Sequence, residues 1–512
     1  MFCTIHSCGL IGMDTFLARV EVDAGTGLPA IDMVGLLNSE VKESKERVKI
    51  ALKNCGYRIP SQRITVNIAP ADKRKEGTAF DLPIAIGIMQ SLDLISSDLD
   101  LTDTIFLGEL GLDGEIRSVK GVLPITKYAR DMGYRRIILP IENAEEGAVI
   151  EGIKVVGVEN LLEVASYLEE PTEKEDICIA PTRIDTSRLF AEEERQYEHD
   201  FANVYGQETL KRAAVIAAAG FHHLMISGTP GAGKTMVAKC MPSILPPLSL
   251  EESLEVSTIY SISGLLKKET PLLIKRPFWN PHHTISTSAL AGGGRNARPG
   301  IISLSHKGIL FLDEFPEFGR ENIEILRQPL EDKQIQISRA QKTVNYPADI
   351  MLVAAMNPCP CGYYPDRNKC RCTPMDIQRY RNRISGPILD RLDLWVEVKG
   401  IPLKMLQQGK KGASSKELRK KVEIARKMQA NRYQNTSILF NSQLKVGEIE
   451  TYCNLGTKEK IYMEQLYKTL DLTARSYHRL LKVARTIADL EQSERIEKEH
   501  ISEAVMFRGW ER

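Results

Sequence analysis

Hydrophobic and polar positions in the first 170 residues follow two periods that alternate along the chain. Residues 16–22 and 63–68 place apolar side chains at every second position, which is the pattern of a half-buried strand. Residues 40–54 space them three and four apart, which predicts a helix. Further elements are expected as helices over 81–92 and 123–132 and as a short strand over 136–140. Residues 1–170 are therefore predicted to form an α/β domain of their own.

The composition changes twice after this domain. Residues 171–199 are polar and rich in acids, so we interpret them as a linker. Residues 200–400 contain three apolar strands and a glycine loop, which predicts a nucleotide-binding module. Residues 401–512 begin with a second polar stretch and continue with helical periodicity. Helices are expected there over 416–431, 457–470, 476–490 and 500–508.

The first apolar strand of the module leads into the glycine loop. Residues 224–226 are apolar, the pattern G-x-x-x-x-G-K-T follows over 228–235, and a helix is expected next. In this context backbone N–H groups and a helix N-terminus converge on phosphate groups. Lys234 is expected to reach the β- and γ-phosphates of ATP, and Thr235 to hold Mg²⁺. A plain surface turn is disfavoured, because the pattern and its context agree. The predicted cradle comprises Gly228, Thr229, Pro230, Gly231, Ala232, Gly233, Lys234 and Thr235.

Two further strands deliver polar residues to their carboxyl ends. Residues 307–314 form an apolar strand that ends in Asp313 and Glu314. At the C-terminal edge of a parallel sheet, Asp313 is expected to hold Mg²⁺ through water, and Glu314 to act as general base for the attacking water. The strand over 349–355 leads to Asn357, which we expect to orient that water. Two solvated acids at a strand end are the alternative, which the phosphate loop upstream disfavours.

Basic residues punctuate the segments between these strands. The longest segments are 276–288 and 291–300, and residues 330–346 are predicted to form a hairpin. Lys and Arg on such loops bind phosphates without reading a base sequence. His282 and His283 are expected to point in opposite directions, as neighbours on one strand do, so a structural or phosphate-contact role is preferred to metal binding. The basic residues are Lys267, Lys268, Lys275, Arg276, Arg295, Arg298, Lys333, Arg339 and Lys342.

Four cysteines follow the third strand at close spacing. Cys359 and Cys361 form one C-x-C pair, and Cys370 and Cys372 form another after an intervening loop. Two such pairs across a loop rich in glycine and proline can supply four thiolates to tetrahedral zinc. We favour a structural zinc site over free surface thiols or a redox pair. The other cysteines are scattered and are expected to be inert.

The overall composition is that of a globular protein and narrows the choice of partners. Of 512 residues, 43% are hydrophobic, and the formal net charge is +1, so any nucleic-acid site has to be a local basic patch. The N-terminus lacks the features of a signal peptide, and no apolar run is long enough to span a bilayer. Ten cysteines in such a chain indicate a reducing compartment. We therefore expect a cytoplasmic protein with no membrane partner.

Three strands of which the third ends at an asparagine resemble the AAA+ superfamily, and most closely its minichromosome-maintenance helicases and Mg-chelatase branch. Residues 388–393 resemble the segment that carries an arginine finger, which would place Arg391 on the ATP of a neighbouring subunit. Residues 473–475 resemble the sensor-2 segment, so Arg475 is expected to touch the γ-phosphate from a helical lid that closes on the nucleotide. A surface salt bridge is the alternative for either arginine. In this branch, insertions of the kind noted above line the central pore of a ring.

Residues 1–170 resemble the proteolytic domain of the Lon family, which has the ribosomal protein S5 domain 2-like fold. The resemblance rests on residues 75–77 before the helix at 81, on 114–116 and on 138–143. Lon-type proteases use a Ser–Lys dyad, and the matching positions here are Ala79 and Leu123, which can act neither as nucleophile nor as base. The resemblance therefore implies a catalytically dead relative that serves assembly or contacts a partner. A hydrolase that uses other residues is the disfavoured alternative.

The whole chain resembles the YifB/ComM group of Mg-chelatase-like AAA+ proteins, most specifically over 280–288, 355–362 and 482–489. The expected fold is α/β, with a Lon-protease-like domain, a P-loop AAA+ ATPase core and a C-terminal helical lid. The resemblance implies a homo-hexamer that uses ATP and Mg²⁺ to translocate on single-stranded or branched DNA without sequence preference. It implies a helicase or branch-migration factor in recombination or natural transformation. The alternatives are a motor subunit of Mg-chelatase, which the Lon-like domain counts against, and an ATPase that remodels proteins.

Overall fold

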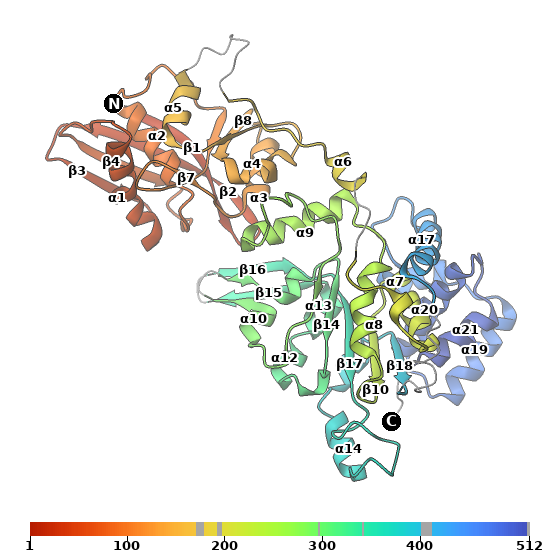
Figure 1. Cartoon of the computed structure of the whole chain (residues 1–512). Coiled ribbons are helices and arrows are strands. Elements are labelled where there is room, and N and C mark those ends of the chain that lie inside the picture. Colours follow the sequence, from red (N-terminus) through yellow and green to blue (C-terminus); the bar gives the residue numbers. More distant parts are fainter. Residues whose placement is uncertain (170–178, 192–196, 295–296, 340–341, 401–411, 509–512) are drawn as a thin grey trace. The chain divides into compact units, whose positions relative to one another are not determined.

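The computed structural model describes residues 1–169, 179–191, 197–294, 297–339, 342–400 and 412–508 (Figure 1). It contains two compact units. One comprises Met1–Glu192 with Leu250–Ile274, and the other comprises Glu193–Ser249 with Lys275–Arg512. Much of the predicted linker, the polar stretch 401–411 and Arg295 lie outside the described residues. The first unit holds the predicted N-terminal domain, and the second holds the nucleotide module and the C-terminal helices.

A seven-stranded mixed sheet forms the first unit. Its strands follow the order β3 (Ala30–Val34), β4 (Arg63–Ala69), β2 (Asp14–Gly25), β1 (Phe2–Ile11), β5 (Thr104–Phe106), β8 (Arg136–Pro140) and β9 (Lys154–Val158). β2 pairs antiparallel with β1 and β4, whereas β5, β8 and β9 continue the sheet in parallel pairs. Side chains of β2 and β4 alternate between buried and more exposed positions, as their two-residue period predicts.

Five helices from the N-terminal part of the chain belong to this unit: α1 (Ser39–Asn54), α2 (Asp81–Ser91), α3 (Val122–Asp131), α4 (Ile141–Ala148) and α5 (Leu161–Glu169). α2 is buried at every position, which explains its nearly uninterrupted apolar sequence. Its single acid, Asp81, accepts hydrogen bonds from the Ser44 hydroxyl and from Arg47 Nε, the latter at 2.7 Å. Arg47 Nη2 donates a third at 2.9 Å, and the backbone N–H of Leu110 donates a fourth at 3.2 Å. These donors satisfy the buried carboxylate and tie α2 to α1 and to the small hairpin of β6 (Glu109–Leu110) and β7 (Ile116–Arg117).

A segment from the middle of the chain completes the first unit. α9 (Leu250–Ser263) and the residues up to 274 belong here, although they fall within the range that the sequence assigns to the nucleotide module. The Ser261 hydroxyl donates to the buried Glu146 carboxylate of α4 at 2.5 Å. Leu272 packs with Leu123 of α3. Hydrophobic periodicity identifies a helix but not the domain on which it packs, so the sequence could not assign this segment.

A five-stranded parallel sheet forms the core of the second unit. Its order is β11 (Phe278–Trp279), β14 (Ile309–Leu312), β17 (Met351–Met356), β10 (Leu224–Gly228) and β18 (Leu394–Val398). All neighbouring strands run parallel, so their carboxyl ends meet at one edge. The three predicted strands are confirmed as β10, β14 and β17. They are buried throughout, which is why their sequences are continuous apolar runs.

Helices surround this sheet and continue into the C-terminal region. α7 (Glu208–Gly220) precedes β10, and α8 (Lys234–Cys240) follows it. The predicted C-terminal helices are confirmed as α17 (Ser415–Arg432), α19 (Thr457–Thr469), α20 (Ala474–Leu490) and α21 (Lys498–Met506), with α18 (Val446–Tyr452) in addition. The predicted hairpin is β15 (Gln334–Arg339) with β16 (Lys342–Pro347). Among the described residues, none of the helices combines the length and the apolar character that a membrane span needs.

The remaining elements are short. They are α6 (Thr186–Ala191), α10 (Thr287–Ala291), β12 (Gly292–Gly293), β13 (Arg298–Pro299), α11 (Ile301–Leu304), α12 (Arg320–Glu324), α13 (Arg327–Asp332), α14 (Pro374–Arg381) and α15 (Gly386–Leu389). Single turns of 3-10 helix cover Phe201–Asn203, Met241–Ser243, Phe315–Glu317 and Asn441–Gln443. Most of these elements lie in the loops that follow the strands of the parallel sheet.

Candidate functional site

The glycine loop connects β10 to α8 at the carboxyl edge of the parallel sheet (Figure 1). β10 ends at Gly228, and α8 begins at Lys234. Gly231 and Gly233 have φ angles of +75° and +84°, a left-handed conformation that residues with side chains rarely adopt. Glycine at these two positions lets the loop turn tightly without strain. The predicted phosphate cradle is therefore built from a strand, a loop and a helix N-terminus in the expected order.

The Lys234 ammonium connects the glycine loop to the end of β17. It donates hydrogen bonds to the Gly228 carbonyl at 2.5 Å and to the Asn357 side-chain oxygen at 2.9 Å. Burial lowers the pKa of Lys234, and the nearby Asp313 and Glu314 act in the opposite direction. β10 and β17 are adjacent strands, so the sheet itself brings the loop and Asn357 together. An ammonium held in this way is a preorganised charge for phosphate oxygens.

The two groups predicted to hold Mg²⁺ are in contact. The Thr235 hydroxyl donates to a carboxylate oxygen of Asp313 at 2.6 Å. Thr235 belongs to the first turn of α8, and Asp313 follows β14 directly. Hydroxyl and carboxylate oxygens are ligands that Mg²⁺ uses, with water in its remaining positions. The two side chains therefore fit a magnesium ion at the mouth of the cradle.

Glu314 has a backbone conformation that is unusual for a residue with a side chain. Its φ is +51°, in the left-handed region, and its side chain is 55% exposed. Such a conformation costs about 1 kcal/mol or more for a non-glycine residue and persists only where the surroundings impose it. The Glu314 carboxylate lies 3.3 Å from Nδ1 of His283. The carboxylate thus borders open space, as a group that activates water requires.

The two adjacent histidines contradict the prediction that they point in opposite directions. β11 ends at Trp279, and both residues lie beyond it in a loop, with ring centroids 4.1 Å apart. Side chains alternate only within an extended strand, so the rule does not apply to this loop. His282, His283 and Asn280 all line the same cleft as the glycine loop. Sequence reasoning gave Asn280 no role and did not place His283 beside Glu314, because only the pairing of β11 with β14 brings this loop to the cleft.

These side chains line one cleft of about 720 Å³. Apart from the two histidines, Lys234 is the only basic side chain among the described residues that line it. The cleft thus offers groups to bind phosphates, hold Mg²⁺ and activate water. None of its described lining residues is the arginine that sites of phosphoryl transfer commonly use.

Arg391 and Arg475 lie together in a second cleft of the same unit. Arg391 donates to the Pro387 carbonyl at 2.6 Å and forms an ion pair with Glu331. Arg475 belongs to the first turn of α20. Neither arginine lines the cleft of the glycine loop. In this structure, Arg475 of the helical lid therefore does not line the nucleotide cradle of its own chain. The sequence led us to expect that the lid closes on the nucleotide and brings Arg475 to the γ-phosphate.

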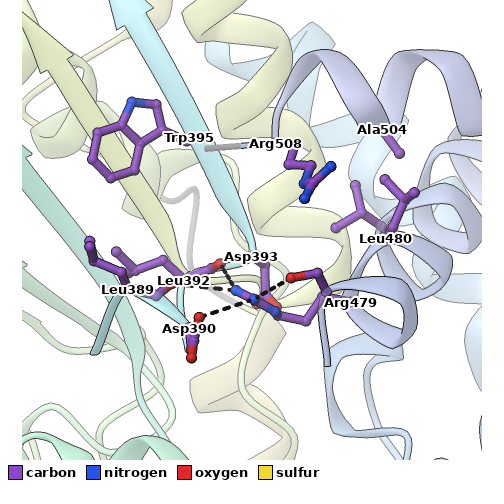
Figure 2. A pocket seen from close by; sticks show the side chains of 11 residues that line it. Leu389, Asp390, Leu392, Asp393, Trp395, Arg479, Leu480, Ala504 and Arg508 are labelled. Atoms are coloured by element: carbon purple, nitrogen blue, oxygen red, sulfur yellow. Dashed lines mark hydrogen bonds and ion pairs between the residues drawn. The ribbon is translucent and has the colours of Figure 1, made fainter. Parts of the chain in front are cut away.

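The segment that carries Arg391 is fixed to the lid by Arg479 of α20 (Figure 2). The Arg479 guanidinium donates to the Leu392 carbonyl at 2.6 Å and lies 3.9 Å from the Asp390 carboxylate. Two residues after Arg391, the Asp393 carboxylate accepts a hydrogen bond from the backbone N–H of His223 at 3.0 Å. Both neighbours of Arg391 are therefore anchored, so the position of the arginine is coupled to the helical lid.

Comparison with known proteins assigns the whole chain. Models of magnesium chelatase subunit ChlI match residues 200–406 and, for its C-terminal part, 412–508, and a further ChlI model matches 20–143. The competence protein ComM of Haemophilus influenzae is 40% identical over 508 residues, 99% of this chain and 97% of its own. The protein YifB of Escherichia coli K12 is 40% identical over 509 residues, with the same coverage. The chain belongs to the ComM/YifB family of Mg-chelatase-like proteins. The family assignment agrees with an AAA+-type use of ATP and Mg²⁺ in the first cleft.

The N-terminal domain of this ComM/YifB-family protein has a partial match to a protease. Lon protease 2 of Bacillus subtilis is 29% identical over 144 residues, 28% of this chain and 25% of its own. At the two dyad positions the side chains are apolar. Leu123 is buried against Leu272 from the segment after α9, and Ala79 packs at the edge of a separate apolar cluster. Leu123, which the resemblance matches to the dyad lysine, is therefore surrounded by apolar side chains.

The described basic residues of the insertions differ in their burial and in the unit to which they belong. Arg276 is buried and donates to three backbone carbonyls at 2.7, 2.8 and 3.1 Å. A guanidinium used in this way holds loops together, so the prediction that Arg276 binds phosphates is wrong. Lys267 and Lys268 are exposed but belong to the first unit, whereas Arg298 is exposed on β13 of the second. Phosphate binding by these exposed residues stays a prediction.

The four cysteines predicted as zinc ligands come together in the second unit. Cys359, Cys361, Cys370 and Cys372 place their sulfur atoms within 4.8 Å of one another. Cys359 and Cys370 are buried, and the other two are partly exposed. The loop that carries them starts two residues after Asn357. The two C-x-C pairs therefore form one cluster next to the nucleotide cleft.

Proposed function

We propose that this protein is an ATP-hydrolysing motor that assembles as a homo-hexameric ring and acts on DNA, as a helicase or branch-migration factor. One observation carries the proposal. The groups that bind phosphate and activate water share one cleft, whereas Arg391 and Arg475 share another. A chain built in this way has a complete site only where the second cleft of one copy meets the first cleft of the next. Repetition of such a head-to-tail contact forms a ring when the rotation between successive copies closes, and we propose six copies.

The residues then divide the reaction among themselves. Lys234 and the loop amides bind the β- and γ-phosphates, and Thr235 and Asp313 hold Mg²⁺, which neutralises phosphate charge when bound. Glu314 accepts a proton from the attacking water, which Asn357 orients.

Arg391 and Arg475 of the neighbouring subunit stabilise the charge on the phosphate oxygens in the transition state. A change in the bound nucleotide would shift Arg391 of the neighbour. Because Arg479 ties the Arg391 segment to α20, the lid of that neighbour would move as well.

DNA is the proposed substrate for two reasons. The chain is 40% identical over nearly its full length to a protein named for competence. In addition, the exposed Arg298 of β13 and the hairpin of β15 and β16 both belong to insertions of the ATPase unit. Basic side chains on loops grip the phosphate backbone without reading the bases, which suits single-stranded or branched DNA.

Two other substrates fit the same ATPase. The chelatase models that match the chain favour a motor subunit that serves insertion of Mg²⁺ into a porphyrin. A protein-remodelling ATPase would use the same cleft on an unfolded chain. Stimulation of ATP hydrolysis by a tetrapyrrole system or by unfolded protein, with no response to DNA, would favour these alternatives.

The proposal is tested by ATP hydrolysis in the full-length protein with single-stranded, duplex and four-way-junction DNA. Lys234→Ala removes the ammonium of the cradle and is expected to abolish turnover. Lys239→Ala is its matched control, because Lys239 is exposed on the same helix. If the proposal is right, DNA stimulates ATP hydrolysis by Lys239→Ala, whereas Lys234→Ala shows no stimulated hydrolysis. Hydrolysis in Lys234→Ala at the level of the control would refute the site assignment.

A further inference from the structure

The loop between β17 and α14 has almost no hydrophobic core of its own. Its apolar cluster consists of the four cysteines with Ile377 and Tyr364. Between Asn357 and the start of α14 at Pro374, the loop has no regular secondary structure. A lobe this small does not bury enough apolar surface to order itself and commonly depends on a bound metal or on cross-links. Among the described residues of this core, the cysteines are the groups that can bind a metal or form cross-links.

The distances between the sulfur atoms distinguish among their states. Cys359 Sγ lies 3.3 Å from Cys361 Sγ and 3.8 Å from Cys370 Sγ, and the latter two sulfurs are 3.6 Å apart. A disulfide would need about 2.05 Å. Four thiolates around zinc, each about 2.3 Å from the metal, lie about 3.8 Å apart in a tetrahedron. The separations among Cys359, Cys361 and Cys370 are thus too long for a bond between sulfurs and close to those around a shared metal, and Cys372 lies within 4.8 Å of the other three.

The surroundings suit a thiolate-bound ion. The backbone N–H of Tyr364 donates to Cys359 Sγ at 3.4 Å, an interaction that stabilises a negatively charged sulfur. The Arg367 and Arg381 guanidiniums lie 5.3 and 5.6 Å from the Tyr364 ring, next to the cluster. These positive charges balance the net negative charge of a zinc ion with four thiolates.

The same lobe touches the nucleotide cleft at two points. A Cβ added to Gly362 would lie 2.8 Å from the Pro230 ring of the glycine loop, so the cysteine loop packs directly on the cradle. On α14, which starts two residues after Cys372, the buried Tyr380 hydroxyl is hydrogen-bonded to the backbone of Asn357. Asn357 in turn accepts the hydrogen bond from Lys234. Each end of the cysteine cluster is therefore connected to a group of the ATP site.

We propose that Cys359, Cys361, Cys370 and Cys372 bind one zinc ion, and that the zinc-bound lobe positions Asn357 against Lys234 for ATP hydrolysis. The four cysteines are metal ligands, and Tyr380 is a positioning residue that acts through Asn357. The zinc assignment stands independently of the proposed motor function. The positioning role rests on the ATPase activity of that proposal but not on its DNA substrate.

The zinc assignment is tested by metal analysis of the purified full-length protein. One equivalent of zinc per chain is expected, and Cys370→Ser should lose most of it. Cys55→Ser, a change in the first unit, serves as the matched control and should keep the full equivalent. Cobalt introduced in place of zinc should give the strong thiolate charge-transfer absorption of a tetrahedral sulfur site. Wild-type protein without zinc, iron in its place, or zinc retained in Cys370→Ser would each overturn the assignment.

The positioning role is tested by Tyr380→Phe, which removes one hydroxyl and leaves the cysteines intact. We expect zinc content and the affinity for ATP to stay unchanged while kcat falls about five-fold, the effect of one lost hydrogen bond. Removal of zinc by a chelator, followed by restored Mg²⁺, should lower kcat further and increase proteolysis within the lobe. A kcat unchanged in both experiments would refute the positioning role and leave the zinc result intact. A fall in ATP affinity parallel to kcat would show general loss of structure and refute it as well.

Discussion

The separation of Arg391 from the phosphate cradle makes a specific prediction about mixed assemblies. Arg391→Ala and Lys234→Ala should each be inactive alone, for different reasons. The first lacks the arginine that it offers to its neighbour, and the second lacks the ammonium of its own cradle. In a mixture, an Arg391→Ala subunit still has an intact cradle, and a Lys234→Ala neighbour still has an intact arginine. Such a contact is complete, so activity should reappear on mixing.

The effects of Arg391→Ala on folding stability and on turnover can each be estimated. The Arg391 ion pair is with Glu331, whose side chain is 60% exposed, so loss of the pair costs at most about 1 kcal/mol of folding free energy, and loss of the hydrogen bond to the Pro387 carbonyl costs about 1 kcal/mol more. An arginine that stabilises a phosphoryl transition state contributes about 10³- to 10⁵-fold in kcat, or about 4 to 7 kcal/mol. Arg391→Ala should therefore fold normally and lose nearly all turnover. In a random equimolar mixture, about one contact in four joins an intact cradle to an intact arginine, so recovery of up to about a quarter of wild-type activity is expected.

The assay is steady-state ATP hydrolysis by the two purified variants, alone and after joint reassembly. A mixture of Arg327→Ala with Lys234→Ala is a useful control. Arg327 forms a surface ion pair with Glu324, so the Arg327→Ala variant should be active by itself. Two inactive variants that remain inactive after mixing, with mixed assemblies demonstrated by differential labelling, would refute the shared site. Arg391→Ala with wild-type turnover would refute it more simply.

Three further predictions concern single residues. Glu314→Gln should bind ATP with wild-type affinity and lose turnover, and equal turnover would exclude Glu314 as the base. Arg276→Ala should lower the free energy of unfolding of its unit by about 2–4 kcal/mol, because three backbone carbonyls in buried or partly buried positions lose a charged donor, whereas the exposed neighbour Lys275→Ala should change little in the same denaturant titration. Burial raises the pKa of Glu146 above its ordinary value of 4.5, so the folded state holds that proton more tightly than the unfolded state. The stability from this carboxyl is therefore present below pH 4.5 and lost as the pH rises through the folded-state pKa, and Glu146→Gln should flatten that slope of unfolding free energy against pH.

Patterns confined to a short stretch of sequence were sufficient for much of this site. The glycine loop, Asp313, Glu314 and Asn357 each stand at the end of a continuous apolar run, and parallel strands bring such ends to one edge. The cysteine pairs are equally local, since one loop carries all four ligands. In these cases the spacing along the chain and the distance in space carry the same information.

Features that depend on long-range packing could not be predicted. Arg276 is buried because it bonds to a loop that lies 30 residues away in the sequence. A basic residue in a polar segment carries no local sign of such burial. α9 has no sequence signal for the domain on which it packs, and the hydrogen bond from Ser261 to Glu146 decides it. For the adjacent histidines, the prediction assumed a strand, but β11 is only two residues long and ends before them. Their rings therefore do not alternate and lie 4.1 Å apart. The separate cleft of Arg475 follows from the placement of the whole lid, which no local pattern encodes.

The proposed ATP-driven motor is best tested by measuring how ATP hydrolysis responds to DNA across a range of salt concentrations. We expect strong stimulation by single-stranded or branched DNA that fades as salt rises, because contacts to phosphates release counterions. Robust hydrolysis that is indifferent to every DNA at every salt concentration would contradict it.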